Sequence, residues 1–290
     1  MTRKEIKSLS QDKLRGRWTN FLLLVLIVSV VQGLVTYLIS NIESIGVSSI
    51  LNLGNSFLLG PFLESLLVVF VIKLVDRDDK IELKESIPSC KVWRNFIKKL
   101  LALILFELPI SLIASVIAVV SLVSIISNHF YEYLFMASMN YEDILRDYIG
   151  IFIIIILIVA IYNIIVSLFF FPVKYIIVEE PELGIWEAVG KAFKMMKGHK
   201  WELFVLILSL IGWAILASLP LVLGVIIILL MNISVYILPI FSIALLWFIV
   251  YRDTIYRVYY LSISERALEI GKDELNQDIE VEEEDFEFRD

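Results

Sequence analysis

The chain has 290 residues, of which 59% are hydrophobic and 20% are charged, and its formal net charge is −7. Ordinary soluble domains are about 45–50% apolar, and the apolar excess here is gathered in long blocks, which excludes a single water-soluble core. The acidic residues concentrate near the C-terminus and leave no continuous basic face for phosphates, which argues against nucleic-acid binding.

Six blocks are long and apolar enough to cross a bilayer, since a spanning helix needs about 20 mainly apolar residues. The first follows a basic segment, 1–17, and no small-residue cleavage site comes after it, so we expect a retained helix rather than a signal peptide. Asn232 is the expected turn between the last two blocks, because Pro220 and Pro239 would each leave one half too short. The predicted spans are 18–40, 51–72, 100–126, 150–171, 203–230 and 234–251.

The placement of lysine and arginine predicts how these spans are oriented. The segments on one side hold six, eight, five and five of these residues, whereas the loops on the other side hold a single one, Arg146. In all, 24 of the 25 basic residues share one side, which the positive-inside rule assigns to the cytoplasm. The sequence therefore predicts an all-α polytopic transmembrane helix bundle, with a basic interfacial segment at 1–17, six spans within 18–265 and both termini in the cytoplasm.

A W-x-x-F motif begins at Trp18, Trp93 and Trp201, each time where the chain is expected to enter the membrane. Each motif precedes a pair of spans, which indicates three tandem units of a basic interfacial segment and a helical hairpin. The alternative is that tryptophan simply favours the membrane interface. His199 either contacts a lipid phosphate or caps a helix end. The expected interface and lipid-headgroup contacts are Trp18, Trp93, Lys197, His199, Lys200 and Trp201.

Residues 182–198 are expected to form an amphipathic helix on the cytoplasmic side. Pro181 suits a first helical position and Gly198 suits a C-terminal cap. Glu187 and Lys191 have the spacing to pair on its polar face. The helix would lie on the inner leaflet or dock on the protein's own spans. Its apolar stripe consists of Leu183, Trp186, Val189, Phe193 and Met196.

Two charged residues lie well inside the expected spans, Glu64 and Glu107, and an ionised carboxylate at a helix centre costs about 2.5 kcal/mol or more. Both lie roughly 12–14 Å from the cytoplasmic boundary, and Asn163 and Ser209 offer polar groups at a similar depth. No lysine or arginine is expected there, so the carboxylates would be protonated, share a proton or hold a cation. The four residues form either a layer for a proton, a cation or a cationic substrate, or ordinary helix packing beside a kink at Pro109.

The sequence contains no catalytic or cofactor motif, since G-x-S-x-G, Walker A, H-E-x-x-H and G-x-G-x-x-G are all absent. The two histidines, His129 and His199, and the single cysteine, Cys90, lie on separate segments, so neither a metal site nor a disulfide is expected. The last segment, 266–290, is acidic and polar and is expected to be a disordered cytoplasmic tail. We therefore expect a protein that is not an enzyme and needs no cofactor.

The run AVGKAFKMMKGHKWELF at 188–204 is followed by LSLIGW at 208–213. These two runs resemble the signature of the domain-of-unknown-function 975 family of bacterial integral membrane proteins, and the N-terminal RKEIK and KLRGRW resemble its opening. The resemblance covers about 1–265. The chain departs from the family at Glu179-Glu180-Pro181, where Asp-Asn-Pro is usual, and at Val250-Tyr251, where Pro-Tyr is usual. The resemblance implies a polytopic protein of the bacterial plasma membrane and supplies no activity.

These patterns favour a non-enzymatic accessory or envelope-organising protein. Its expected partners are the lipid bilayer and either another membrane protein or a second copy of the chain. The alternative is a small permease or exporter that uses Glu64 and Glu107, although the spans hold few polar residues and no obvious pair of broken helices. An enzyme acting on lipid would need clustered acids or histidines at the headgroup level, and the sequence offers none.

Overall fold

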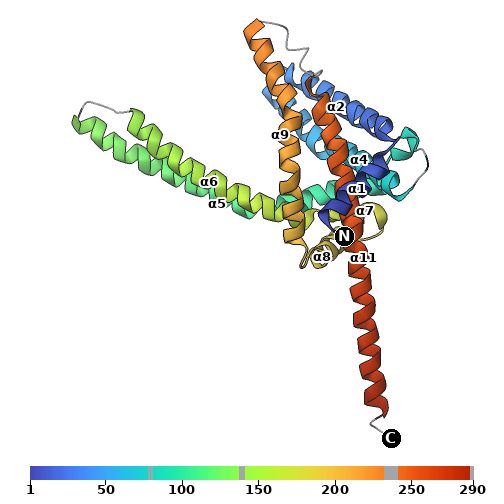
Figure 1. Ribbon diagram of the computed structural model, residues 1–290. Coiled ribbons are helices and arrows are strands. Elements are labelled where there is room, and N and C mark those ends of the chain that lie inside the picture. The colour runs from blue at the N-terminus through green and yellow to red at the C-terminus, as the bar shows by residue number, and fades with distance from the viewer. Residues whose placement is uncertain (78, 80, 137–140, 232–240, 288–290) are drawn as a thin grey trace. The chain divides into compact units, whose positions relative to one another are not determined.

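A computed structural model describes the chain except for residues 78, 80, 137–140, 232–240 and 288–290 (Figure 1). The described residues form helices and connecting turns, with no strand among them. They divide into two compact units, one made of Met1–Lys98 and Pro172–Asp290 and the other of Lys99–Phe171.

The first unit is organised around one long helix, α11, which contacts α1, α2, α4, α8 and α9. A π-helical turn, η1 (Asn55–Leu59), joins α3 to α4 without a break, and a short 3₁₀ turn, η2 (Leu83–Ser86), follows α4. The helices of this unit are α1 (Arg3–Leu14), α2 (Trp18–Ser40), α3 (Ile45–Gly54), α4 (Gly60–Asp76), α7 (Val173–Glu179), α8 (Ile185–Met195), α9 (Lys200–Met231) and α11 (Ile243–Glu287).

The basic N-terminal segment folds as α1, which begins with a capping box: the Thr2 hydroxyl accepts from the Glu5 amide at 3.3 Å, and the Glu5 carboxylate accepts from the Thr2 amide at 2.9 Å. Residues at four-residue spacing, Ile6, Ser10 and Leu14, are buried and form the face of α1 that packs on the protein. Gly16 then adopts φ +74°, a left-handed conformation that lets the chain turn from α1 into α2.

Five segments among the described residues are helical, long and apolar enough to cross a membrane. This finding confirms the expectation of an all-helical chain of membrane type. The first of them coincides with the predicted span 18–40, whereas the second begins at Ile45 because α3 takes in apolar residues that were assigned to a loop. The predicted turn at Asn232 and much of the span 234–251 lie outside the described residues. The five segments are Trp18–Ser40, Ile45–Asp76, Cys90–Ser121, Ile153–Glu179 and Lys200–Met231.

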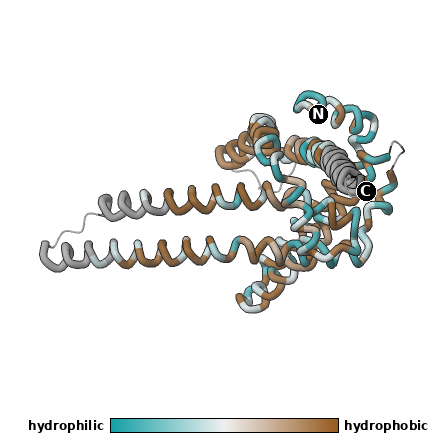
Figure 2. The backbone as a smooth tube through the Cα atoms, turned by 90° about the horizontal axis from the view of Figure 1, so that it is seen from below, coloured by the Kyte–Doolittle hydropathy of each residue, from teal (hydrophilic) through white to brown (hydrophobic). Residues whose placement is uncertain are grey.

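The second unit is a helical hairpin made by the later part of α5 (Cys90–Met136) and by α6 (Tyr141–Phe170). The two helices run side by side, and apolar residues cover most of their described length (Figure 2). Phe106 and Phe170 meet edge to face with their ring centroids 5.2 Å apart. Many large apolar side chains of this hairpin are exposed, as expected of helices that face lipid.

A helix, α8 (Ile185–Met195), lies within the segment 182–198, and one of its faces packs on protein. Ala188, Val189 and Ala192 are buried, and α8 contacts α7 and α11. The predicted pairing of Glu187 with Lys191 is not the one observed, because the Glu187 carboxylate accepts from the Gly184 amide at 3.1 Å and Lys191 instead pairs with Glu180. Gly198 has φ +88°, which agrees with a role in ending the helical segment. The last helix, α11, continues into the acidic segment 266–290 as far as Glu287.

Candidate functional site

The four residues of the expected polar layer fall into different units. Glu64 on α4 and Ser209 on α9 belong to the first unit, and Glu107 on α5 and Asn163 on α6 belong to the second. The Ser209 hydroxyl donates to the Leu206 carbonyl at 2.7 Å, and the Asn163 amide donates to the Val159 carbonyl at 3.0 Å. Both polar groups are thus satisfied within their own helices.

Near Glu107, the second unit carries a hydrogen bond that links its two helices. Pro109 lies inside α5, where a proline cannot donate to the carbonyl four residues earlier and loosens the helical ladder. The neighbouring Phe106 carbonyl accepts from the Tyr162 hydroxyl of α6 at 2.5 Å. This bond satisfies polar groups of the hairpin in a place where lipid could not.

A groove of about 860 Å³ lies between α2, η1 and α4, in segments apolar enough to span a membrane. We call it the α2–α4 groove. The Gln32 amide donates to Asn55 Oδ1 at 3.4 Å, whereas Gln32 Oε1 is buried with no hydrogen-bond partner among the described residues. A methyl group added at Gly33 would meet nothing within 4 Å, so the groove is open beside this residue. The polar side chains that line the groove are Ser29, Gln32, Thr36, Asn55, Ser56 and Glu64.

A second, smaller cavity of about 160 Å³ lies on another side of Glu64. Lys174 and Arg252 line it together with Glu64, so the expectation that no basic residue would accompany the glutamates does not hold for Glu64. Arg252 Nη2 lies 2.8 Å from Asp253 Oδ1, and Lys174 Nζ lies 4.9 Å from the centroid of the Tyr175 ring. Glu64 therefore separates a polar groove from a cavity that holds both signs of charge.

A buried arginine, Arg257, joins three helices close to this cavity. Its side chain is 1% exposed and donates to both oxygens of Asp76, from Nη2 at 2.6 Å and from Nε at 3.3 Å. Nη1 donates to Glu179 Oε1 at 2.5 Å, and the Tyr260 hydroxyl donates to Glu179 Oε2 at 2.7 Å. The guanidinium also lies 5.2 and 5.6 Å from the ring centroids of Tyr260 and Tyr175. We call Asp76, Tyr175, Glu179, Arg257 and Tyr260 the Arg257 cluster.

The electrostatics of the Arg257 cluster keep its guanidinium charged and its phenol neutral. Burial lowers the pKa of Arg257, but its hydrogen bonds to Asp76 and the nearby charge of Glu179 outweigh burial, so that the net pKa is raised. Burial raises the pKa of Tyr260, and its hydrogen bond to the Glu179 carboxylate raises it further. Two carboxylates thus face one guanidinium, which ties the ends of α4 and α7 to α11.

The expected interface residues differ in how much they are exposed. Trp201 is 72% exposed, as expected of a side chain that meets lipid headgroups. Trp18 instead stacks on Trp247 with ring centroids 5.2 Å apart, and the Trp93 indole donates to the Leu58 carbonyl at 3.0 Å, so both contact protein. The three W-x-x-F motifs therefore have different surroundings.

His199 occupies the turn before α9, and Lys197 and Lys200 flank it. Its Nδ1 lies 3.2 Å from Glu202 Oε2, and its carbonyl accepts from the Leu203 amide at 3.0 Å and from the Tyr259 hydroxyl at 3.0 Å. These contacts place it at the N-terminus of a helix, as in the helix-capping alternative, although it caps the start of α9 rather than the end of α8.

Reasoning from the sequence missed the amides of the groove and the whole Arg257 cluster. The signal for the groove was available, since Gln32 and Asn55 are amides within apolar blocks and were passed over in favour of charged residues. The signal for the cluster was weaker: Asp76, Glu179 and Arg257 each lie at the end of an apolar block, but nothing in the sequence pairs them.

Comparisons with known proteins give one match. No curated protein and no solved structure matches the chain. A family model described as protein of unknown function (DUF975) matches residues 1–267, which is nearly the whole chain. The chain therefore belongs to the DUF975 family.

Proposed function

We propose that this is a non-enzymatic accessory protein of the bacterial plasma membrane, and that its α2–α4 groove holds a transmembrane helix of a partner membrane protein. The observation that carries this proposal is the polar lining of the groove within segments that are otherwise apolar. The occupant that fits is a helix that carries hydroxyl or amide side chains on one face.

Lipid hydrocarbon cannot satisfy the polar side chains that line this groove. Thr36 and Ser56 are exposed, and lipid tails cannot accept or donate the hydrogen bonds that such groups make. A polar group left without a partner costs about 1–3 kcal/mol by measurements on protein variants. Gln32 Oε1 already lacks a partner among the described residues, and a donor from an incoming helix would satisfy it.

The shape of the groove also suits a helix. Gly33 and Gly60 line it, and small residues let two helix backbones approach closely within a membrane. The π-helical turn η1 widens the backbone next to Gly60, and such turns recur at functional sites in helices. At the C-terminal end of α4, the Arg257 cluster holds the helix at Asp76, which would keep one wall of the groove in place.

The proposed setting follows from the charge pattern. Six spans with both termini in the cytoplasm place 24 of the 25 lysines and arginines on the inner side. Reporter fusions within the segments 73–99 and 172–202 would test this topology, and a report from opposite faces of the membrane would contradict it.

Photocrosslinking from within the groove tests the docking proposal. A photoreactive residue replaces Thr36, which lines the groove, or Leu34, which is 56% exposed and lies about 160° away around the same helix. In living cells, Thr36 is expected to crosslink to one defined membrane protein. Leu34 is expected to give only lipid adducts.

Mass spectrometry of the crosslinked peptides identifies the occupant. A transmembrane segment of another protein, attached from Thr36 alone, supports the proposal. Crosslinks from Thr36 only to lipid, to a second copy of the chain or to its own segment Lys99–Phe171 would overturn it.

A permease is the second candidate, and one observation favours it. Glu64 and Leu67 line both the α2–α4 groove and the cavity that holds Lys174, Arg252 and Asp253. A carboxylate between a polar groove and a charged cavity has the placement to pass a proton or a cation. This candidate predicts a flux that depends on Glu64.

A further inference from the structure

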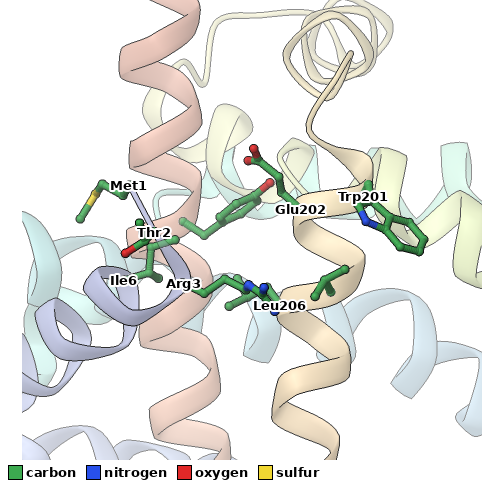
Figure 3. Close-up of a pocket in the computed structure, with 9 residues that line it drawn as sticks. Met1, Thr2, Arg3, Ile6, Trp201, Glu202 and Leu206 are labelled. Atoms are coloured by element: carbon green, nitrogen blue, oxygen red, sulfur yellow. The ribbon is translucent and has the colours of Figure 1, made fainter.

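A separate pocket of about 350 Å³ lies between the first turn of α1 and the first two turns of α9 (Figure 3), and Tyr259 of α11 also lines it. Its walls include three apolar side chains, Ile6, Val205 and Leu206, and its polar groups include Arg3 and Glu202. The pocket belongs to neither the α2–α4 groove nor the Arg257 cluster.

Arg3 supplies a positive charge that the fold leaves available. Its side chain extends from α1 toward α9 and Leu206 in Figure 3, and no described residue forms a hydrogen bond or an ion pair with it. A guanidinium presents its donors in a planar fork that matches two phosphate oxygens. The apolar walls beside it do not suit a small, fully hydrated anion.

The depth of the pocket matches a lipid headgroup. Leu206 lies six residues into α9, which is about 9 Å along the helix from Lys200. Trp201 projects from the first turn of α9, is 72% exposed and stacks on Phe204 with ring centroids 5.4 Å apart. Exposed tryptophans of this kind mark the boundary between headgroups and hydrocarbon. Arg3 and Trp201 therefore flank the level at which a lipid phosphate meets its acyl chains.

Glu202 is the one acidic side chain among the described residues that line the pocket, and its carboxylate contacts His199. One of its oxygens lies 3.2 Å from His199 Nδ1. Two basic residues lie nearby in the sequence, Lys197 in the turn before α9 and Lys200 at the start of α9. Together with Lys7, four residues after Arg3 on α1, they make the surroundings of the pocket positive. Such a setting favours a lipid with net negative charge over a zwitterionic one.

We propose that this pocket binds one anionic phospholipid of the inner leaflet. The phosphate lies on the Arg3 guanidinium, and one acyl chain lies along the half-buried Val205 and the exposed Trp201 of α9. The lipid fastens α1 to α9, two helices that are distant in sequence. This inference does not depend on the docking of a partner helix in the α2–α4 groove.

Thermal unfolding of the full chain in a neutral detergent tests the proposal. Short-chain phosphatidylglycerol is the probe, and phosphatidylcholine of the same chain length and inorganic phosphate are its comparisons. Saturating phosphatidylglycerol is expected to raise Tm by about 4 °C, whereas the other two change it by less than about a quarter of that amount.

Arg3→Gln is expected to remove most of this shift, and Val205→Trp, which fills the apolar wall from a half-buried position, is expected to remove it as well. Lys4→Gln is the matched control, because it makes the same change of charge on the same helix outside the pocket. Arg3→Gln alters an exposed side chain and leaves the apolar packing intact, so it keeps the test valid even if Val205→Trp fails to fold. Equal shifts in Arg3→Gln and Lys4→Gln, or an equal response to phosphatidylcholine or inorganic phosphate, would overturn the proposal.

Discussion

Arg257 and Asp76 lie 181 residues apart in the sequence and share two hydrogen bonds, from Nη2 at 2.6 Å and from Nε at 3.3 Å. The same guanidinium donates to Glu179, so one buried side chain joins α4, α7 and α11. Removing the guanidinium would leave two carboxylates facing each other beside the ring of Tyr175. The ends of these three helices therefore depend on one another.

Replacing Arg257 by alanine is expected to destabilise the protein by about 3 kcal/mol, near the lower limit for a broken buried ion pair. The lower limit applies because Asp76 and Glu179 are 38% and 33% exposed, so water partly solvates the abandoned carboxylates. Arg257→Lys keeps the charge but loses the planar fork, and it is expected to recover only part of the loss. Chemical unfolding in detergent measures both variants, and an Arg257→Ala protein as stable as wild type would contradict the assignment.

Tyr260 predicts how stability depends on pH. Its folded pKa is raised above the ordinary value, first by burial and then by Glu179. The stability it contributes is therefore complete below the unfolded pKa, about 10, and declines as the pH rises past that value. Tyr260→Phe is expected to lower stability at neutral pH by about 1 kcal/mol and to flatten this alkaline decline. Unfolding free energies measured from about pH 8 to pH 11 check the difference; parallel curves for the two proteins would refute it.

The sequence predicts long apolar helices because each depends on a local property. An apolar block such as 18–40 must form a helix in lipid, where every backbone polar group needs an internal partner. The charge at Arg257 has no such local meaning, since its partners Asp76 and Glu179 are fixed only by the packing of distant helices. The same holds for Lys174 and Arg252, which the sequence places beyond the spans and the fold brings to the cavity of Glu64.

For some residues the sequence identifies the residue type but does not predict its contacts. Trp93 was expected to meet lipid because tryptophan favours the interface, yet its indole donates to the Leu58 carbonyl. In the sequence Gln32 stands out less than a charged residue does, because burying an amide in a span costs less free energy than burying a charge. Its importance follows from the position of Asn55 and from the open space beside Gly33, and neither can be read from composition.

Gln32→Leu separates stability from partner binding. In the isolated protein this change removes a buried acceptor without a described partner and a long hydrogen bond of 3.4 Å, so stability is expected to change by less than about 1 kcal/mol. Retention of the partner helix is expected to fall about fivefold or more, because its donor loses a buried acceptor. Quantitative co-purification from mildly solubilised membranes measures retention. Ser40→Leu serves as control, since the Ser40 hydroxyl bonds only within its own helix and lies outside the groove; an equal loss in both variants would count against a specific site.

Glu64 decides between the accessory protein and the permease. Under the accessory proposal, proteoliposomes that contain the wild-type chain are expected to pass protons, sodium and potassium no faster than empty liposomes, and Glu64→Gln is expected to change nothing. Glu43→Gln, which alters an exposed carboxylate between α2 and α3, is the matched control. A flux that wild type and Glu43→Gln share and that Glu64→Gln abolishes would instead assign transport to the carboxylate that lines both cavities.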